Sequence, residues 1–339
     1  MRVALADPPA FTPQYDHALA TALARAGADV RLLTSPFRFG EAPAPDGYAR
    51  EESFYPLSSR LFRRSRLRLP LRALEHLAVL RRMRRVAADV VHLQWLAWPS
   101  ADSRLRFAAP AVFTAHDILP RRTATRADLW RRLLAKFDRV VAHSERGRAA
   151  LAELGVDARV IPHPVFRSEI ARADEGETVL ALGVIRPYKG LPDAVEATRR
   201  IGARLLVAGD PVDVTVPEAP HVERRLGYLP EAEIDRALAG ATVAVFPYRP
   251  ELDQSGALLR ALGAGVPAVA YDVGGIAEPV RRFGAGVVVP PGDVDALAQG
   301  LRAVLDAPEP FRAGAERART ELTWDAAARA HLELYGEVT

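Results

Sequence analysis

Short apolar runs alternate with amphipathic stretches along this chain. The apolar run at residues 2–6 predicts a strand, and the apolar spacing of residues 15–26 predicts a helix that Gly27 ends. The next apolar run, at residues 29–34, predicts a second strand. This strand–loop–helix–strand order is typical of a doubly wound parallel sheet, although the loop lacks the glycine-rich turn of dinucleotide-binding folds.

The alternation continues through the first half of the chain. Residues 37–56 have no periodic pattern and predict a loop, whereas residues 60–88 predict a helix broken at Pro70. The other strands predicted in this half are residues 89–94, 111–116 and 138–143, with helices at residues 127–137 and after residue 145.

A polar stretch without periodicity, residues 166–176, predicts a linker between two domains. The alternation then restarts, with strands predicted at residues 179–182, 204–208, 222–225, 244–247, 268–271 and 286–289 and with later helices starting at Asp293 and at residue 322. We therefore expect two α/β domains, residues 1–165 and 177–321, separated by a cleft. Ligands should collect at the carboxyl ends of the parallel strands.

Composition agrees with a globular protein of about two domains, because 49% of the 339 residues are hydrophobic and 26% are charged. The absence of cysteine excludes disulfides, thiol nucleophiles and cysteine-ligated zinc. The N-terminus is too briefly apolar for a secretion signal, and no apolar run approaches the roughly 20 residues that span a bilayer. These features predict a cytoplasmic protein.

Positive charge is concentrated in one segment, since ten arginines fall between Arg60 and Arg85 although the net charge is only +4. Such a segment could contact an anionic membrane on its inner face, at about 1 kcal/mol per basic residue, or an acidic acceptor. A solvated face is the slightly favoured alternative. Nucleic acid is disfavoured, because no aromatic residues are interleaved and no nucleic-acid-binding module accompanies the arginines.

The loop at residues 183–190 is the first candidate site. It joins a predicted buried strand to a helix, a place where free N–H groups and the helix dipole favour an anion. The loop also carries Arg186 and Lys189, and Lys189 is one of only two lysines in a chain with 46 Lys and Arg. A compact ammonium suits a phosphate oxygen in a tight loop, so we favour an anion site over chance retention of a lysine.

The turn at Ser255 and Gly256 is the second candidate. Ser255 is a good N-cap, and Gly256 lets a ligand approach the start of the helix that follows. Alone, the turn could equally cap a buried helix, but together with residues 183–190 it predicts a two-pronged phosphate clamp. Glu278 is either a ligand contact or a first-turn carboxylate favoured by the helix dipole, with equal weight.

His116 ends a predicted strand beside Asp117, where an imidazole can face the cleft. Weaker candidates of the same kind are His92, His143 and His163. Asp293 and Asp295 have the spacing of a metal-binding pair, but Asp293 is better explained as a helix N-cap. No other acidic or histidine cluster has metal-ligand spacing, so no metal is predicted.

Taken together, these motifs resemble those of family 4 glycosyltransferases. In the second half the resemblance rests on residues 183–190, 209–210, 227–230, 247–248, 254–256, 265–267 and 272–278, and in the first half on residues 91–95, 114–120, 143–145 and 161–163. It implies an α/β GT-B fold, with two Rossmann-like parallel-sheet domains around an interdomain cleft. It also implies that the C-terminal helix, residues 322–339, packs back on the N-terminal acceptor domain.

The resemblance further implies a retaining, metal-independent hexosyltransferase-like enzyme that uses a nucleotide-diphosphate sugar and no cofactor. The acceptor could be a polysaccharide, a lipid-linked sugar or a small molecule. Catalytic roles are implied for His116, Arg186 and Lys189. Donor binding is implied for Gly183, Arg186, Lys189, Gly227, Tyr228, Leu229, Ser255, Gly256, Ala257, Leu258 and Glu278, and acceptor-side contacts for Pro13, Tyr15, Gln94, Trp95 and Asp117.

Two departures from the family pattern leave other functions open. Leu252 and Arg260 stand where the family often carries two glutamates, and Pro8 and Pro9 replace its usual glycine pair. One alternative is a nucleotide-sugar epimerase of the same fold, which would need acid–base carboxylates. The other is a degenerate subunit that binds a nucleotide or a partner without chemistry.

Overall fold

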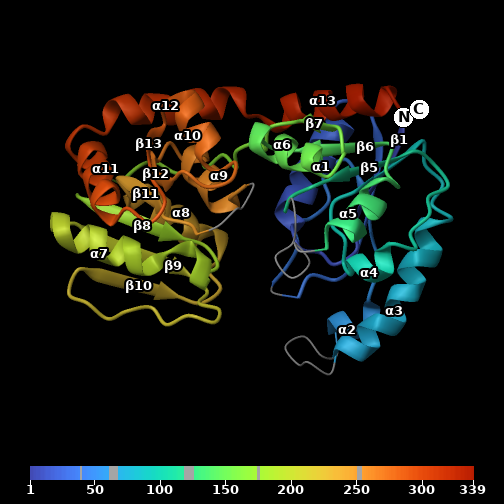
Figure 1. The fold of residues 1–339 in the computed structure, drawn as a ribbon, viewed down its shortest axis with the longest axis horizontal. Coiled ribbons are helices and arrows are strands. Elements are labelled where there is room, and N and C mark those ends of the chain that lie inside the picture. The colour runs from blue at the N-terminus through green and yellow to red at the C-terminus, as the bar shows by residue number, and fades with distance from the viewer. Residues whose placement is uncertain (39, 61–67, 118–125, 174–175, 250–253) are drawn as a thin grey trace. The chain divides into compact units, whose positions relative to one another are not determined.

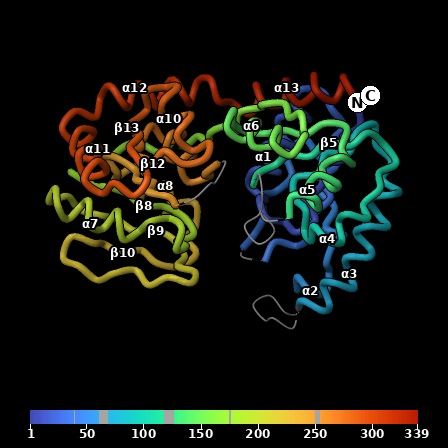
Figure 2. The backbone as a smooth tube through the Cα atoms, in the orientation of Figure 1, coloured from blue at the N-terminus to red at the C-terminus, as the bar shows by residue number. Residues whose placement is uncertain are grey.

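The computed structural model describes residues 1–38, 40–60, 68–117, 126–173, 176–249 and 254–339. The chain forms two compact units. Unit 1 comprises Met1–Pro162 and Trp324–Thr339, and unit 2 comprises His163–Thr323, so the chain leaves unit 1 once and returns to it at its end (Figure 2). No helix of the described ranges is both long and apolar enough to cross a membrane.

Unit 1 contains a parallel sheet in the order β3-β2-β1-β4-β5-β6-β7. Its strands are β1 (Arg2–Asp7), β2 (Asp29–Thr34), β3 (Ala49–Glu52), β4 (Val90–Leu93), β5 (Ala111–Thr114), β6 (Arg139–Ala142) and β7 (Ala158–Val160). The central strands β4 and β5 are buried along their whole length, which is why they read as continuous apolar runs. Strand order reverses direction between β1 and β4, so the loops after these two strands flank a natural ligand position.

Seven helices accompany the described part of this sheet: α1 (Pro13–Arg25), α2 (Pro56–Arg60), α3 (Arg68–Met83), α4 (Pro99–Asp102), α5 (Ala127–Leu134), α6 (Glu145–Glu153) and α13 (Trp324–Gly336). The last helix lies against α1 (Figure 1). It buries Tyr335, whose hydroxyl lies 2.6 Å from Nδ1 of His92 on β4. The C-terminal helix is therefore part of the core of unit 1.

Unit 2 contains a second parallel sheet, in the order β10-β9-β8-β11-β12-β13. Its strands are β8 (Thr178–Leu182), β9 (Arg204–Gly209), β10 (Val222–Leu226), β11 (Val243–Phe246), β12 (Ala268–Tyr271) and β13 (Gly286–Val289). Its helices are η1 (Pro187–Lys189), α7 (Leu191–Ile201), α8 (Glu231–Gly240), α9 (Gly256–Gly263), α10 (Ala277–Phe283), α11 (Val294–Asp306) and α12 (Glu309–Glu321). Strand order reverses between β8 and β11, which places the loops after these strands together.

Three predictions from the sequence need correction. Strand β3 lies within residues 37–56, predicted as a loop, because a charged edge strand of four residues carries no apolar pattern. Pro70 does not interrupt the described part of α3, which runs through it from Arg68 to Met83. The terminal helix predicted from residue 322 starts at Trp324 and follows a separate helix, α12.

Residues 166–176, predicted as a linker, fall within unit 2 where they are described. The N–H of Ser168 donates to the carbonyl of Gly263, at 3.2 Å, and the N–H of Ala173 donates to the carbonyl of Ala239, at 2.9 Å. These backbone bonds tie a polar segment to the surface of unit 2, which an apolar pattern cannot reveal.

Candidate functional site

The loop after β8 packs tightly against the loop after β11 in unit 2. Gly190 has φ +64°, and a Cβ atom there would lie 1.9 Å from the carbonyl oxygen of Pro247. Gly209 at the end of β9 is equally constrained, because its Cβ would lie 2.0 Å from the carbonyl oxygen of Gly183. Only glycine permits these backbone approaches, so the loop is held in one conformation by its neighbours.

Lys189 lies inside this loop rather than in open solvent. Its Nζ donates to the carbonyl of Leu182, at 3.1 Å, and lies 5.1 Å from the ring centroid of Tyr248. A Cβ at Gly183 would lie 3.2 Å from the same ammonium, so the missing side chain leaves room for it. A carbonyl and an aromatic face therefore position the positive charge at the carboxyl end of β8.

The start of α9 meets the same loop. Ser255 is its N-cap: Oγ accepts from the N–H of Leu258, at 3.3 Å, and lies 3.1 Å from the hydroxyl of Tyr248. The Cβ of Ala257 lies 3.5 Å from the Cβ position of Gly183, which places the first turn of α9 beside the lysine loop. The capping prediction for Ser255 is confirmed, and the N–H of Leu258 is engaged by that cap.

Other residues predicted for donor binding lie around this cluster in unit 2. Arg186 is exposed at the start of η1, and its guanidinium has no hydrogen bond or ion pair within the described residues. The N–H of Gly227 donates to the carbonyl of Gly209, at 3.0 Å, and the adjacent Tyr228 is 58% exposed. Glu278 lies in the first turn of α10, as the helix-dipole interpretation required.

Arg260 belongs to a structural ion pair. Its guanidinium makes two hydrogen bonds, of 2.6 and 3.0 Å, to the carboxylate of Glu231 at the start of α8. Its Cζ also lies 5.0 Å from the ring centroid of Phe166. Leu252, the other departure from the family pattern, lies outside the described residues.

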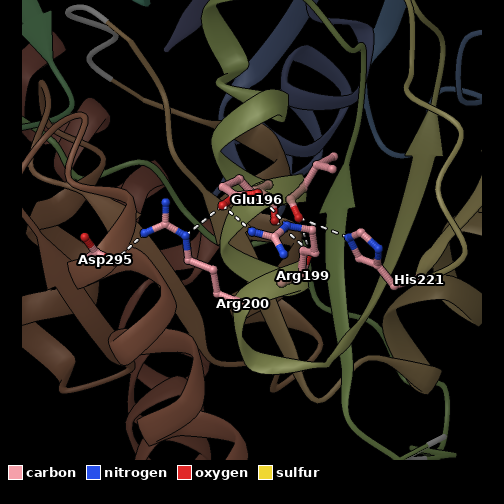
Figure 3. A network of polar contacts seen from close by, with 8 residues as sticks. Glu196, Arg199, Arg200, His221 and Asp295 are labelled. Carbon is pink, nitrogen blue, oxygen red and sulfur yellow. Dashed lines mark hydrogen bonds and ion pairs between the residues drawn. The ribbon is translucent and has the colours of Figure 1, made fainter.

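Charged residues on the outer face of α7 form a network of their own (Figure 3). The carboxylate of Glu196 accepts from Arg199 and Arg200, and Arg200 also pairs with Asp295 of α11. The hydrogen bonds from Arg199 and Arg200 lower the pKa of Glu196 to about 2. Arg200 therefore joins two helices, whereas Arg186 and Lys189 lie at the carboxyl end of the sheet. Asp293 caps α11 through a 2.8 Å bond from the N–H of Ala296, which confirms its prediction as an N-cap.

In unit 1, His116 is oriented by three side chains. Its Nε2 lies 2.9 Å from the side-chain amide of Gln94. The indole of Trp95 stacks on the imidazole at 5.0 Å and 12°, and the ring of Tyr15 meets it edge-on at 4.6 Å. One amide and two aromatic rings therefore hold the imidazole in place.

Trp95 is itself fixed by the loop between β1 and α1. Its Nε1 donates to Oγ1 of Thr12, at 2.8 Å, and its ring contacts Phe11 edge-on. The backbone N–H groups of Phe11 and Thr12 in turn donate to the carboxylate of Asp7, at 2.7 and 3.1 Å. A carboxylate at the end of β1 therefore orders the loop that holds the indole.

Asp7 and Asp16 form a buried carboxyl pair beneath this loop. Burial raises the pKa of Asp7, and burial together with the neighbouring Asp7 raises the pKa of Asp16 well above its usual value. Two close buried carboxylates disfavour ionisation of one another, which is why the pKa of Asp16 is raised further by Asp7. Burial also lowers the pKa of His143, whose Nδ1 donates to the carbonyl of Ile161, to about 4.

The predicted residues thus gather in two places, each within its own unit. Gly183, Lys189, Ser255 and Ala257 meet in unit 2, and Tyr15, Gln94, Trp95 and His116 meet in unit 1. Pro13 is the first residue of α1, and Asp117 follows His116. The sequence analysis missed Asp7, Thr12 and Tyr248, although Asp7 and Tyr248 follow apolar strands at the points where strand order reverses.

Two family models match the chain. The model of Glycosyltransferase Family 4 matches residues 14–168, and the model of Glycosyl transferases group 1 matches residues 176–307. The chain thus has a Glycosyltransferase Family 4 domain followed by a Glycosyl transferases group 1 domain. The predicted α/β fold class is confirmed, since the chain has the two Rossmann-like parallel sheets of the GT-B fold.

Similar proteins agree with these two domains. Glycogen synthase from Mycobacterium tuberculosis is 32% identical over 197 residues, 53% of this chain and 46% of that protein. The chain spans about half the length of the curated relatives it matches. Sucrose-phosphate synthase from Thermosynechococcus elongatus has a TM-score of 0.74 at 22% identity, over 99% of this chain and 98% of its own. Anabaena Alr3699/HepE in complex with UDP has a TM-score of 0.71 at 15% identity, over 99% and 100%.

Proposed function

We propose that this protein transfers a sugar from a nucleotide-diphosphate donor to an acceptor hydroxyl, and that the donor diphosphate binds between the lysine loop and the start of α9. The observation that carries the proposal is the position of Lys189. Its ammonium is fixed by Leu182 and Tyr248 beside Gly183 and the first turn of α9. Phosphate oxygens favour such a combination of fixed charge and helix N-terminal N–H groups.

The proposed reaction breaks the bond between the sugar C1 and the diphosphate oxygen and forms a bond from C1 to the acceptor oxygen on the same face. The departing diphosphate takes the bonding electrons and gains negative charge, and the proton of the acceptor hydroxyl passes to the departing diphosphate. Lys189 and Arg186 would stabilise that charge in place of a metal. Retention is proposed because the resemblance to family 4 glycosyltransferases implies it. His116, oriented by Gln94 and Trp95, would act at the donor sugar, and the loop before α1 would help bind the acceptor. Such a reaction fits the cytoplasmic location expected from the sequence.

UDP and UDP-glucose are the first donors to test, because Alr3699/HepE has been solved with both. We expect Lys189→Ala to weaken binding of UDP at least tenfold by isothermal titration calorimetry, since one charge-assisted bond is worth about 1.5–3 kcal/mol. Lys136→Ala is the matched control, because Lys136 is the other lysine of the chain and lies in unit 1. Unchanged affinity in Lys189→Ala would refute the placement of the donor.

The same donors test the chemistry. With a mixture of acceptor sugars and EDTA present, we expect transfer to continue and NMR to show the anomeric configuration of the donor in the product. Inversion, or complete dependence on an added divalent cation, would contradict the proposed mechanism. Product analysis without an acceptor separates transfer from epimerisation.

A binding subunit without chemistry is the second candidate. The observation that favours it is Arg260, which is engaged with Glu231 and Phe166 at a position where relatives often carry a glutamate. Release of UDP from UDP-glucose, slow in the absence of an acceptor and faster in its presence, would exclude this candidate.

A further inference from the structure

Helices α2 and α3 lie side by side in unit 1 and present apolar side chains to solvent (Figure 1). Leu57 of α2 is 51% exposed, and on α3 Leu69, Leu74 and Leu77 are 56%, 69% and 52% exposed. Single exposed leucines are ordinary on protein surfaces, but four on two neighbouring helices form a patch. We call these four residues the leucine patch.

The orientation of α3 is fixed, so Leu74 and Leu77 cannot turn inward. The face of α3 turned away from these two leucines buries His76, Val79 and Met83. The imidazole of His76 is held between the hydroxyl of Tyr55, at 2.7 Å from Nδ1, and the carboxylate of Asp102, at 3.0 Å from Nε2. Polar and apolar contacts therefore both select the face that α3 turns toward the core.

Helix α2 is fixed to α3 by a carboxylate. Glu75 accepts from the N–H of Leu57, at 2.7 Å, and from the N–H of Ser58, at 3.2 Å. These bonds place the backbone of Leu57 beside the middle of α3. Leu74 and Leu77, three residues apart, share one face of α3, and both are exposed.

A basic pocket continues the same face of α3. Its volume is about 420 Å³, and it is lined by Arg31, Leu33, Ala78, Arg81, Arg82, Arg85, Val86 and Ala87. Arg81 lies four residues after Leu77 and seven after Leu74, which is the spacing of one helical face.

The charge of this pocket is only partly neutralised. Arg82 pairs with Glu51, at 2.6 Å to Oε2, and Arg31 donates to the carbonyl of Ala87, at 3.2 Å. Arg81 and Arg85 are exposed and make no ion pair with any residue that the structure describes. The pocket therefore offers two uncommitted guanidinium groups to a phosphate.

We propose that this face docks on an anionic lipid bilayer, with the leucine patch in the headgroup–acyl boundary and Arg81 and Arg85 on lipid phosphates. Leucines beside arginines on one helix face are the combination that an interfacial helix uses. Charge complementarity favours anionic lipid over a protein partner, because the only formal charges that line the pocket are positive. The solvated face favoured from the sequence does not account for four exposed leucines. The arginines of residues 61–67 lie outside the described residues, and the proposal does not depend on them.

Flotation of the purified protein with vesicles tests the proposal. We expect binding to phosphatidylcholine vesicles containing about one-third phosphatidylglycerol, no binding to phosphatidylcholine alone, and loss of binding as salt is raised. Arg81→Gln with Arg85→Gln should weaken binding by about 10- to 30-fold at low salt, at about fivefold per charge. Leu74→Ser with Leu77→Ser should weaken it by a similar factor while leaving the salt dependence intact.

Two matched controls are available outside this face. Leu226→Ser changes a leucine that is 43% exposed in unit 2, and Arg159→Gln changes an exposed arginine on β7. Both should bind vesicles as the unchanged protein does. Melting curves confirm folding, and unchanged UDP affinity of the two double variants separates this surface from the donor site.

Three results would overturn the proposal. The first is absence of binding to anionic vesicles. The second is vesicle binding that neither double variant alters. The third is binding of soluble pyrophosphate that depends on Arg81 and Arg85 while the leucine variant behaves normally, which would identify a site for an acidic soluble ligand.

Discussion

Three neighbouring side chains set the orientation of the His116 ring. Gln94 bonds to Nε2 of His116, and Trp95 and Tyr15 hold the plane of the ring. The side chain of Gln94 is buried, and the imidazole is its hydrogen-bond partner. Gln94 is therefore a positioning residue for His116, although the sequence predicted it only as an acceptor-side contact.

A substitution series at Gln94 tests this role. We expect Gln94→Ala to lower kcat by about 10- to 100-fold with little change in the donor KM. The variant loses the hydrogen bond that positions the imidazole of His116 but loses no contact to the donor. Gln94→Glu should shift the acid limb of the pH–rate profile to higher pH, since a carboxylate favours the protonated imidazole. Gln299→Ala, at an exposed position on α11, is the control. A normal kcat in Gln94→Ala would show that the side chain of Gln94 contributes only to packing.

At the scale of elements, the lysine loop depends on the contact between the loops after β8 and β11. Substitutions at Gly190 and Gly202 measure how much this contact contributes to the free energy of unfolding. Both glycines have a positive φ, of 64° and 68°, and both follow a helical turn. They differ in surroundings: a Cβ at Gly190 would meet the Pro247 carbonyl, whereas a Cβ at Gly202 would have nothing within 4 Å.

We expect Gly202→Ala to cost about 1 kcal/mol of unfolding free energy, from backbone strain alone, and Gly190→Ala to cost about 2–4 kcal/mol because the loops must also separate. Urea unfolding followed by circular dichroism measures both. UDP affinity should fall only in Gly190→Ala. Equal costs for the two variants would show that the Pro247 contact does not hold the loop.

At the scale of the molecule, all four tryptophans lie in unit 1, so fluorescence reports the unfolding of that unit. Burial lowers the pKa values of His143 and His331 to about 4, and lowers the pKa of His92 well below its usual value. Between pH 6.5 and pH 4 these histidines bind protons in the unfolded chain but not in the folded unit. They therefore destabilise unit 1 as the pH falls through that window.

Asp7 and Asp16 act in the opposite direction, because their raised pKa values let the folded unit bind protons that the unfolded chain releases.

The contribution of one histidine to the pH dependence of stability is isolated by a variant. We expect His331→Asn to remove on the order of 2–3 kcal/mol of the stability difference between pH 7.5 and pH 4.5, measured by urea unfolding and tryptophan fluorescence. His221→Asn, in unit 2, should leave this difference unchanged. An unchanged pH dependence in His331→Asn would show that His331 does not titrate as its burial requires.

The sequence alone determined the alternation of strands and helices, and with it the fold class. Central strands such as β11 and β12 are buried along their whole length and read as short apolar runs. Capping also follows local rules, which is why Ser255 and Asp293 were predicted correctly as N-caps.

Only the tertiary structure decided what depends on residues distant in the sequence. The pairing of Arg260 on α9 with Glu231 on α8 and the position of Lys189 against Tyr248 bring together residues from separate helices and loops. A local pattern records the burial of a residue because burial repeats with the period of the helix or strand. It does not record which distant side chain comes to lie beside it, because that follows from strand order and packing.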